Sequence, residues 1–204
     1  MPDTVLLTGF EPFDGRADNP SIEAVRALAR DWSGPERLVV AELPVAYTRA
    51  GDRLAELLVA TDPALALGVG LASGRTRLNL ERLAVNLCDA RIPDNDGHQP
   101  DAAPVVAGAE TALWSTLPVK RMVAAAEAAG CPAELSMTAG TYVCNAVFFQ
   151  LVRWAAADGR RAGFVHVPDS ATLPVAQTVA GLTAGLRTAL EHTEDLRRPA
   201  GAVS

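Results

Sequence analysis

Short apolar runs alternate with segments of helical spacing along most of the chain. Runs typical of buried strands occupy residues 4–9, 38–43, 64–70, 133–137 and 163–167. Between them, apolar residues recur every three or four positions, most clearly at Val147, Phe148, Leu151, Val152 and Ala155. Asn19-Pro20 supplies an N-cap followed by proline at the first helical position, which predicts the start of a helix. Residues 78–88 look extended, and the Asp-, Asn-, Gly- and Pro-rich residues 91–104 predict a long polar loop.

The alternation of strands and helices predicts one α/β domain over residues 1–192, followed by a polar, frayed C-terminal tail over 193–204. The sheet should be mixed and largely parallel with helices on both faces, a three-layer architecture of the phosphorylase/hydrolase-like kind. In such folds reactive groups gather at the carboxyl ends of strands. This rule selects four junctions: after Gly9, after Gly70, around residues 140–144, and after His166.

Composition and charge narrow the possible partners. The chain has 204 residues, of which 49% are apolar and 21% charged, and its net charge is −6. This balance is that of an ordinary globular protein. No run of basic residues is longer than two, so the basic footprint of a nucleic-acid or anionic-membrane binder is missing. We therefore expect no nucleic-acid partner and no membrane partner.

The lack of a recognisable targeting signal and the few, scattered cysteines indicate a reducing compartment. The first residues lack the basic flank and cleavage site of a signal peptide. The longest uncharged stretch, 135–152, is interrupted by Gly140, Asn145 and Gln150, which does not suit a membrane span. Three scattered cysteines are too few for a disulfide framework or a zinc site. We expect a cytoplasmic protein with free thiols that needs no metal or organic cofactor.

Two glycine-containing segments match ligand-binding loops only in part. Residues 68–74 read GVGLASG, but the third glycine comes one residue too late for the dinucleotide fingerprint and no helix follows at once. Residues 94–97 read DNDG, yet the calcium-loop register would make Ile92 the first ligand. We interpret both as structural turns. Nucleotide binding by residues 68–74 remains an alternative, which a thermal shift with nucleotides would test; we expect no shift.

Among the three thiols, Cys144 has the position best suited to nucleophilic chemistry. It lies at the start of the most amphipathic helix, where free N–H groups and the helix dipole favour a thiolate. An inert buried thiol is the alternative, because cysteine is among the most buried residue types. Cys88 ends an apolar strand and is expected in the core, and Cys131 lies in a connector between Gly130 and Pro132.

A nucleophilic thiol needs a base, and His166 is the best candidate. It lies near the end of an apolar strand, whereas His98 and His192 lie in polar segments and should be solvated. The imidazole of a triad is oriented by a carboxylate or an amide. Glu81 and Asp89 both suit that role, and spacing alone does not separate them.

Longer motifs follow one another in a fixed order. Residues 7–15 read LTGFEPFDG and precede Asn19-Pro-Ser21, and residues 139–145 read AGTYVCN. Between and after them come Leu43-Pro-Val45, Gly74-Arg75, Glu81-Arg82, Asn86, residues 89–95 (DARIPDN), and Val165-His166 with Pro168. From about residue 4 to residue 190, this order and spacing resembles the pyroglutamyl peptidase I (pyrrolidone-carboxylate peptidase) family of cysteine peptidases.

The resemblance implies a set of site residues. The family's catalytic triad maps onto Glu81, Cys144 and His166, which favours Glu81 over Asp89. Its pyroglutamyl pocket maps onto Phe10, Phe13, Asn19, Ile92, Tyr142 and Val143. Arg91, with the backbone of Cys144, matches the oxyanion region. The chain departs from the family pattern at Leu71 and Ala146, which concerns affinity more than chemistry because neither is a triad position.

The implied activity is that of a thiol protease and omega-peptidase. It would remove an N-terminal pyroglutamyl residue from peptides through an acyl-enzyme. The substrate's first residue is a neutral lactam, which suits a small pocket with aromatic walls and few polar groups. The family also implies a homo-oligomer, either dimer or tetramer. The alternative is a catalytically weak member that acts as a pyroglutamyl-peptide binding protein, and the intact triad argues against it.

Overall fold

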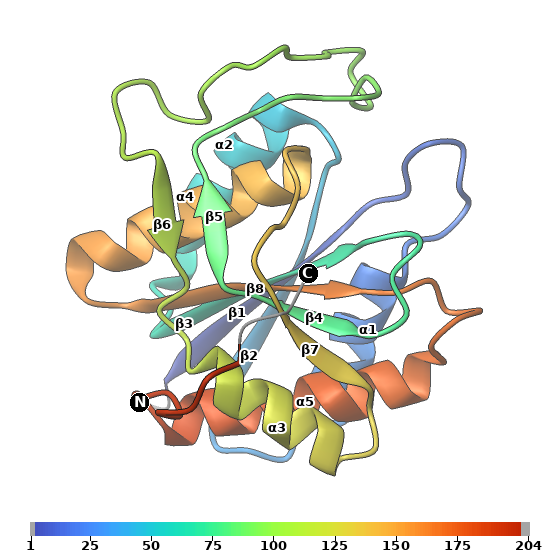
Figure 1. Cartoon of the computed structure of the whole chain (residues 1–204), viewed down its shortest axis with the longest axis vertical. Helices are drawn as coiled ribbons and strands as arrows, with labels where there is room; N and C mark the ends of the chain where they lie inside the picture. Colours follow the sequence, from blue (N-terminus) through green and yellow to red (C-terminus); the bar gives the residue numbers. More distant parts are fainter. Residues whose placement is uncertain (1–2, 201–204) are drawn as a thin grey trace.

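The computed structural model describes residues 3–200, which form a six-stranded sheet between two layers of helices and a separate two-stranded sheet (Figure 1). The strands are β1 (Thr4–Phe10), β2 (Arg37–Leu43), β3 (Leu65–Leu71), β4 (Leu78–Glu81), β5 (Leu83–Val85), β6 (Ala112–Trp114), β7 (Ala133–Ser136) and β8 (Arg161–Val167). The helices are α1 (Pro20–Arg30), α2 (Tyr47–Thr61), α3 (Val119–Ala128), α4 (Val143–Asp158) and α5 (Val175–Glu191). Within residues 3–200, none of these helices is long and apolar enough to cross a bilayer.

The strand order of the main sheet is β2-β1-β3-β8-β4-β7. β1 pairs in parallel with β2 and β3, and β3 pairs in parallel with β8. β4 runs antiparallel to β8 and parallel to β7. Every residue of β3 is buried, as the continuous apolar run of a strand covered on both faces predicts. The predicted mixed, largely parallel sheet is confirmed.

A hydrophobic core lies on each face of this sheet. α2 and α4 cover one face, and α1, α3 and α5 cover the other (Figure 1). In the first core, the ring of Phe148 on α4 packs on Phe164 of β8, with 5.7 Å between centroids. α4 is buried along most of its length because it contacts the sheet, α2 and the β5–β6 hairpin. The helix is thus a firm support for the residues at its N-terminus.

α1 begins as predicted. Asn19 has an extended backbone, and its side chain accepts the N–H of Ser21 at 3.1 Å, while Pro20 is the first helical residue. The Asn19 amide also donates to the carbonyl of Glu11 at 2.9 Å. The helix cap therefore holds the loop that follows β1 as well.

Residues 78–85 are extended, as expected, but they form two strands that belong to different sheets. After β4 ends, the N–H of Arg82 donates to the carbonyl of Ser136 at 2.8 Å, and the chain leaves the main sheet. β5 then pairs antiparallel with β6, a strand that no pattern predicted. A strand of three partly exposed residues carries too little periodicity to be seen in sequence.

The tail beyond α5 is held to α3 by hydrogen bonds at Glu194, Asp195 and Arg198. The Asp195 carboxylate accepts the backbone N–H groups of Lys120 (3.2 Å) and Arg121 (3.1 Å) in the first turn of α3. It also pairs with the guanidinium of Arg82 at 3.0 Å. Pro118, the N-cap residue of α3, makes no side-chain cap bond. Asp195, which is far from α3 in the sequence, supplies the missing hydrogen-bond acceptor. The expectation of a frayed tail is therefore wrong at this position.

Candidate active site

A cavity of about 380 Å³ opens at the carboxyl ends of β1, β3 and β8. Its wall is made by Phe10, Phe13, Asn19, Val45, Leu71, Ala72, Ser73, Arg75, Arg91, Ala139, Gly140, Tyr142, Val143, Cys144 and His166. All four junctions selected from the sequence contribute to it. The junction around residues 140–144 does so differently from the others. β7 points in the opposite direction to β8, so its carboxyl end does not lie at the cavity, and residues 137–142 lead the chain from there to the N-terminus of α4.

Cys144 is the second residue of α4, and its sulfur lies against the backbone of β3. A methyl group added at Gly70 would lie only 2.8 Å from Cys144 Sγ. Gly70 is the register partner of His166 in the pairing of β3 with β8. A glycine is therefore needed where the thiol approaches the strand next to the imidazole.

His166 contacts a buried carboxylate. Its Nδ1 lies 2.8 Å from Oε1 of Glu81, and both side chains are almost completely buried. An imidazole that donates from Nδ1 to a carboxylate has its free lone pair on Nε2, which is the arrangement of a general base. Asp89 is exposed and its backbone bonds to Thr141. Glu81, not Asp89, is the carboxylate that contacts the imidazole.

The surroundings of the Cys144 thiol raise its pKa. Burial and then the negative charge of Glu81 raise its pKa to about 12, although the N–H of its own residue and the Arg75 cation act in the opposite direction. Our expectation that the helix N-terminus favours the thiolate is correct in sign, but burial outweighs it.

The aromatic residues expected in the pocket divide into two kinds. Phe10 is 1% exposed and packs on Phe164 with 6.3 Å between centroids, so it is mainly a core residue whose edge reaches the cavity. Phe13 is half-buried, and its ring lies 6.2 Å from that of Tyr142 across the cavity wall. The hydroxyl of Tyr142 donates to the carbonyl of Pro93 at 3.0 Å, which fixes this wall to the long loop.

The other expected pocket residues are not all at the cavity. Asn19 and Val143 are buried and line it, and Arg91 lines it from an exposed position. Ile92 is half-buried and does not line it. Of the two departures from the family pattern, Leu71 is on the wall and Ala146 is not.

The remaining thiols and imidazoles lie elsewhere. Cys88 and Cys131 are buried, and burial raises the pKa of each to about 11. The ring of His98 packs edge-on against Tyr47 with 5.8 Å between centroids, and His192 is exposed after α5. None of these four side chains lines the cavity.

Arg75 is the charged residue at this cavity that we did not identify as functional from the sequence. It was visible there only as part of a Gly-Arg pair. A stronger signal was present, because Asn79 and Glu81 are two polar residues on one face of a short apolar strand. Buried polar side chains require partners, and an arginine after a glycine turn a few residues earlier can supply one.

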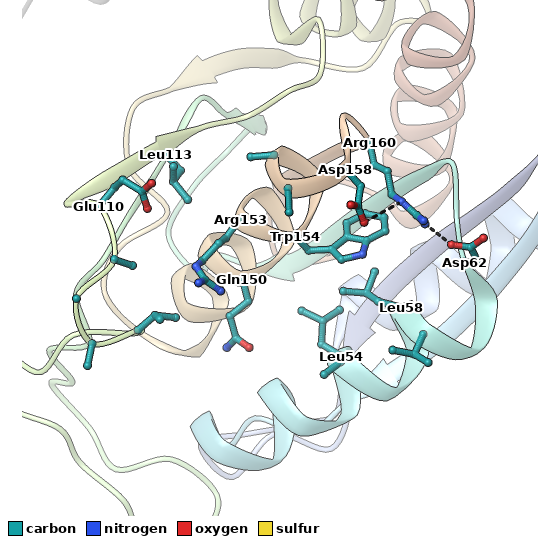
Figure 2. Close-up of a pocket in the computed structure, with 18 residues that line it drawn as sticks. Leu54, Leu58, Asp62, Glu110, Leu113, Gln150, Arg153, Trp154, Asp158 and Arg160 are labelled. Atoms are coloured by element: carbon teal, nitrogen blue, oxygen red, sulfur yellow. Dashed lines mark hydrogen bonds and ion pairs between the residues drawn. The ribbon is translucent and has the colours of Figure 1, made fainter.

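A larger hollow lies between α2, the C-terminal half of α4 and residues 106–110 (Figure 2). Leu54 and Leu58 form part of its apolar wall, and Arg160 at its edge pairs with Asp62 and Asp158. Among residues 3–200, no histidine or cysteine lines it. Its size alone therefore does not make it a site for thiol and imidazole catalysis.

A thiol at a helix N-terminus, next to an imidazole that a buried carboxylate holds, defines a hydrolase site of the cysteine class on an α/β scaffold. Comparison with known proteins gives the particular family. The family model described as pyroglutamyl peptidase matches residues 3–192. The chain belongs to the pyroglutamyl peptidase family.

Individual relatives agree along the whole chain. The pyrrolidone-carboxylate peptidase of Clavibacter michiganensis subsp. michiganensis is 43% identical, with 98% of this chain and 99% of the relative covered. That of Cupriavidus necator is 44% identical, with 97% and 98% covered. The crystal structure of pyroglutamyl peptidase I from Bacillus amyloliquefaciens superposes with a TM-score of 0.91 at 36% identity, covering 98% of this chain and 100% of that one. The pyrrolidone carboxyl peptidase of Thermococcus litoralis gives 0.91 at 31% identity, with 97% and 99% covered.

Proposed function

We propose that this chain removes an N-terminal pyroglutamyl residue from peptides and that Cys144 is the nucleophile. The observation that supports the mechanism is the contact of 2.8 Å between His166 Nδ1 and Glu81 Oε1. His166 lies on β8, and its register partner on β3 is Gly70, the residue against which the Cys144 thiol packs. Membership of the pyroglutamyl peptidase family supports the choice of substrate.

The cavity suits a neutral ring. Its wall combines the rings of Phe13 and Tyr142 with the aliphatic side chains of Val45, Leu71 and Val143. A pyroglutamyl group carries no free α-amine, so it can enter without an anionic partner. A peptide with a free N-terminus would bring an ammonium group into an apolar wall, which costs several kcal/mol when no partner is present.

The proposed acylation step uses Cys144 and His166. The Cys144 thiol gives its proton to Nε2 of His166, and the thiolate attacks the carbonyl carbon that joins pyroglutamate to the next residue. The backbone N–H of Cys144, in the first turn of α4, stabilises the oxyanion together with Arg91. The imidazolium then protonates the leaving amine, and the C–N bond breaks to leave a thioester.

Hydrolysis reverses the roles. His166 takes a proton from water, the hydroxide attacks the thioester carbonyl, and the sulfur leaves and regains its proton from the imidazolium. Glu81 holds Nδ1–H throughout and stabilises the imidazolium that forms twice in each cycle. These steps use protein groups and water alone.

The test is release of a chromogenic amine from its pyroglutamyl amide, compared with the prolyl and glutamyl amides. We expect discrimination of roughly 10⁴ against the prolyl amide, which lacks the lactam carbonyl and carries a charged amine. Similar kcat/KM values for the pyroglutamyl and prolyl amides would contradict the assigned substrate.

The nucleophile is tested separately. Cys144→Ser should abolish turnover with the fold intact, whereas Cys88→Ser and Cys131→Ser should keep most of the activity, because those two thiols lie outside the cavity. Normal turnover by Cys144→Ser would refute the assignment. Binding of a pyroglutamyl peptide by a wild-type protein that neither turns over nor is alkylated at Cys144 would instead indicate a binding protein.

We further propose that the protein acts in the cytoplasm as a homo-oligomer. The family resemblance and the three free thiols support this. Light scattering on the eluted protein would give the mass of the assembly, and a mass equal to one chain would exclude the oligomer.

A further inference from the structure

We infer that Arg75 is a positioning residue, whose guanidinium holds the Glu81 carboxylate in place against His166. Arg75 follows β3 in a tight turn. Gly74 adopts φ +88°, and the N–H of Arg75 donates to the carbonyl of Ala72 at 3.2 Å. The turn sends the side chain back toward the end of β4.

The guanidinium joins three separate segments. The two N–H groups of Nη1 are shared among three acceptors: Oε1 of Glu81 at 2.9 Å, Oγ of Ser136 at 3.2 Å, and Oδ1 of Asn79. Nη2 donates to the carbonyl of Thr138 at 2.9 Å. Thr138 belongs to the connector that leads to the start of α4. One planar fork therefore fixes the carboxylate relative to the segment that places the nucleophile.

The contacts of Glu81 converge on one oxygen. Oε1 forms the contacts with both the imidazole of His166 and the guanidinium of Arg75. Oε2 is buried and has no hydrogen-bond partner in the described part of the chain. The side chain is fully buried. A buried carboxylate is costly unless a fixed cation pairs with it, and the Arg75 guanidinium is such a cation.

The charges of the reacting state balance only with Arg75. When the proton has moved, Cys144 and Glu81 are negative and His166 and Arg75 are positive, so the cluster is neutral. Two further charged groups lie near it: Glu134 of β7, which bonds to Asn79 at 3.2 Å, and Arg91 on the cavity wall. Removing the Arg75 cation leaves the cluster with one negative charge, which disfavours the thiolate of Cys144.

The first experiment compares kcat, KM and the pH dependence of Cys144 alkylation between Arg75→Gln and Arg75→Lys. The matched control is Arg77→Gln, because Arg77 is an exposed arginine close by in the sequence. Arg75→Gln should lower kcat at least about tenfold with a smaller change in KM, on the scale of other residues that orient a catalytic group. The acid limb of Cys144 alkylation by iodoacetamide should move up by about one pH unit. Arg75→Lys should keep the limb near its wild-type position, because the charge remains, but recover only part of kcat. Folded Arg75→Gln with the wild-type kcat and pH profile would overturn the inference.

The second experiment remains informative if Arg75→Gln does not fold. The double variant Glu81→Gln/Arg75→Gln buries no uncompensated carboxylate and is compared with Glu81→Gln alone. If Arg75 acts through Glu81, the two should have kcat values within about threefold, because coupled positions are non-additive. A double variant that is slower by tenfold or more would show that Arg75 acts by another route. Arg75 has this role only if Cys144 is the nucleophile proposed above, and the two ideas fail separately: turnover by Cys144→Ser refutes the nucleophile, whereas additive kcat losses refute Arg75 alone.

Discussion

A single methyl group at Gly70 tests how closely β3 holds the thiol of Cys144. The added Cβ would lie 2.8 Å from Cys144 Sγ and 2.9 Å from Cζ of Phe164, whereas ordinary contacts begin at 3.4 Å. The sulfur, the ring or both must therefore retreat by about half an ångström. Gly70 does not adopt a positive φ, so alanine fits the backbone and the effect is steric.

The expected loss follows from that displacement. A misplacement of about 1 Å at a reacting centre can cost about a hundredfold in rate, so Gly70→Ala should lower kcat roughly tenfold or more. Overpacking should also lower the free energy of unfolding by about 1–3 kcal/mol. The assay measures kcat on the pyroglutamyl amide, the rate at which iodoacetamide modifies Cys144, and the urea unfolding curve.

Gly68→Ala is the matched control on the same strand. Its Cβ would lie 2.5 Å from Cδ2 of Phe164 and 3.1 Å from Cδ1 of Leu151, and the thiol is not among its three nearest atoms. It should therefore lose comparable stability but keep more of kcat and of the alkylation rate. The reasoning is refuted if folded Gly70→Ala matches the wild type in both rates, or if the two variants lose kcat equally.

Four other substitutions separate the effects on chemistry from the effects on packing. His166→Gln should lower kcat/KM at least about a hundredfold. Because burial and Glu81 raise the pKa of Cys144 to about 12, the rate of Cys144 alkylation in this variant should keep rising with pH toward that value. An alkylation rate that reaches a plateau near neutral pH would contradict the role of the imidazole. Phe10→Ala should lower the free energy of unfolding by roughly 3–5 kcal/mol, as for other buried rings. Phe13→Ala should lower it far less and mainly raise KM. Equal losses in Tm would contradict this difference between the two residues. Asp195→Ala should lower stability by about 1–2 kcal/mol, as for loss of a helix cap, without changing kcat/KM, and an unchanged urea midpoint would show that the tail adds nothing.

The main sheet was predictable because its strands are buried on both faces. Continuous apolar runs such as 64–70 leave few alternatives, and Asn19-Pro20 marks a helix start through hydrogen bonding that is local in sequence. The β5–β6 hairpin and the docking of Asp195 on α3 were not predictable. Both depend on partners far away along the chain, and neither three-residue strands nor a lone aspartate produce a periodic signal.

At the site, local chemistry could be predicted and long-range support could not. Cys144 and His166 were selected because nucleophiles and bases occupy helix N-termini and strand ends. The choice between Glu81 and Asp89 required either the family resemblance or the strand pairing, since only the register of β4 against β8 places Glu81 beside the imidazole. The pKa of the thiol also depended on burial, which the position of a helix end does not reveal.

Arg75 shows why the support of a catalytic group is harder to read than the group itself. A nucleophile and a base must be particular residue types, so the sequence limits the candidates to three thiols and three imidazoles. A guanidinium can donate hydrogen bonds to any set of oxygens that fits its planar geometry, and here the acceptors are two side chains of β4, Ser136 and a backbone carbonyl of the connector. Only the folded chain brings these acceptors together, and for that reason the structure, rather than the motif that contains Arg75, gives the residue a role.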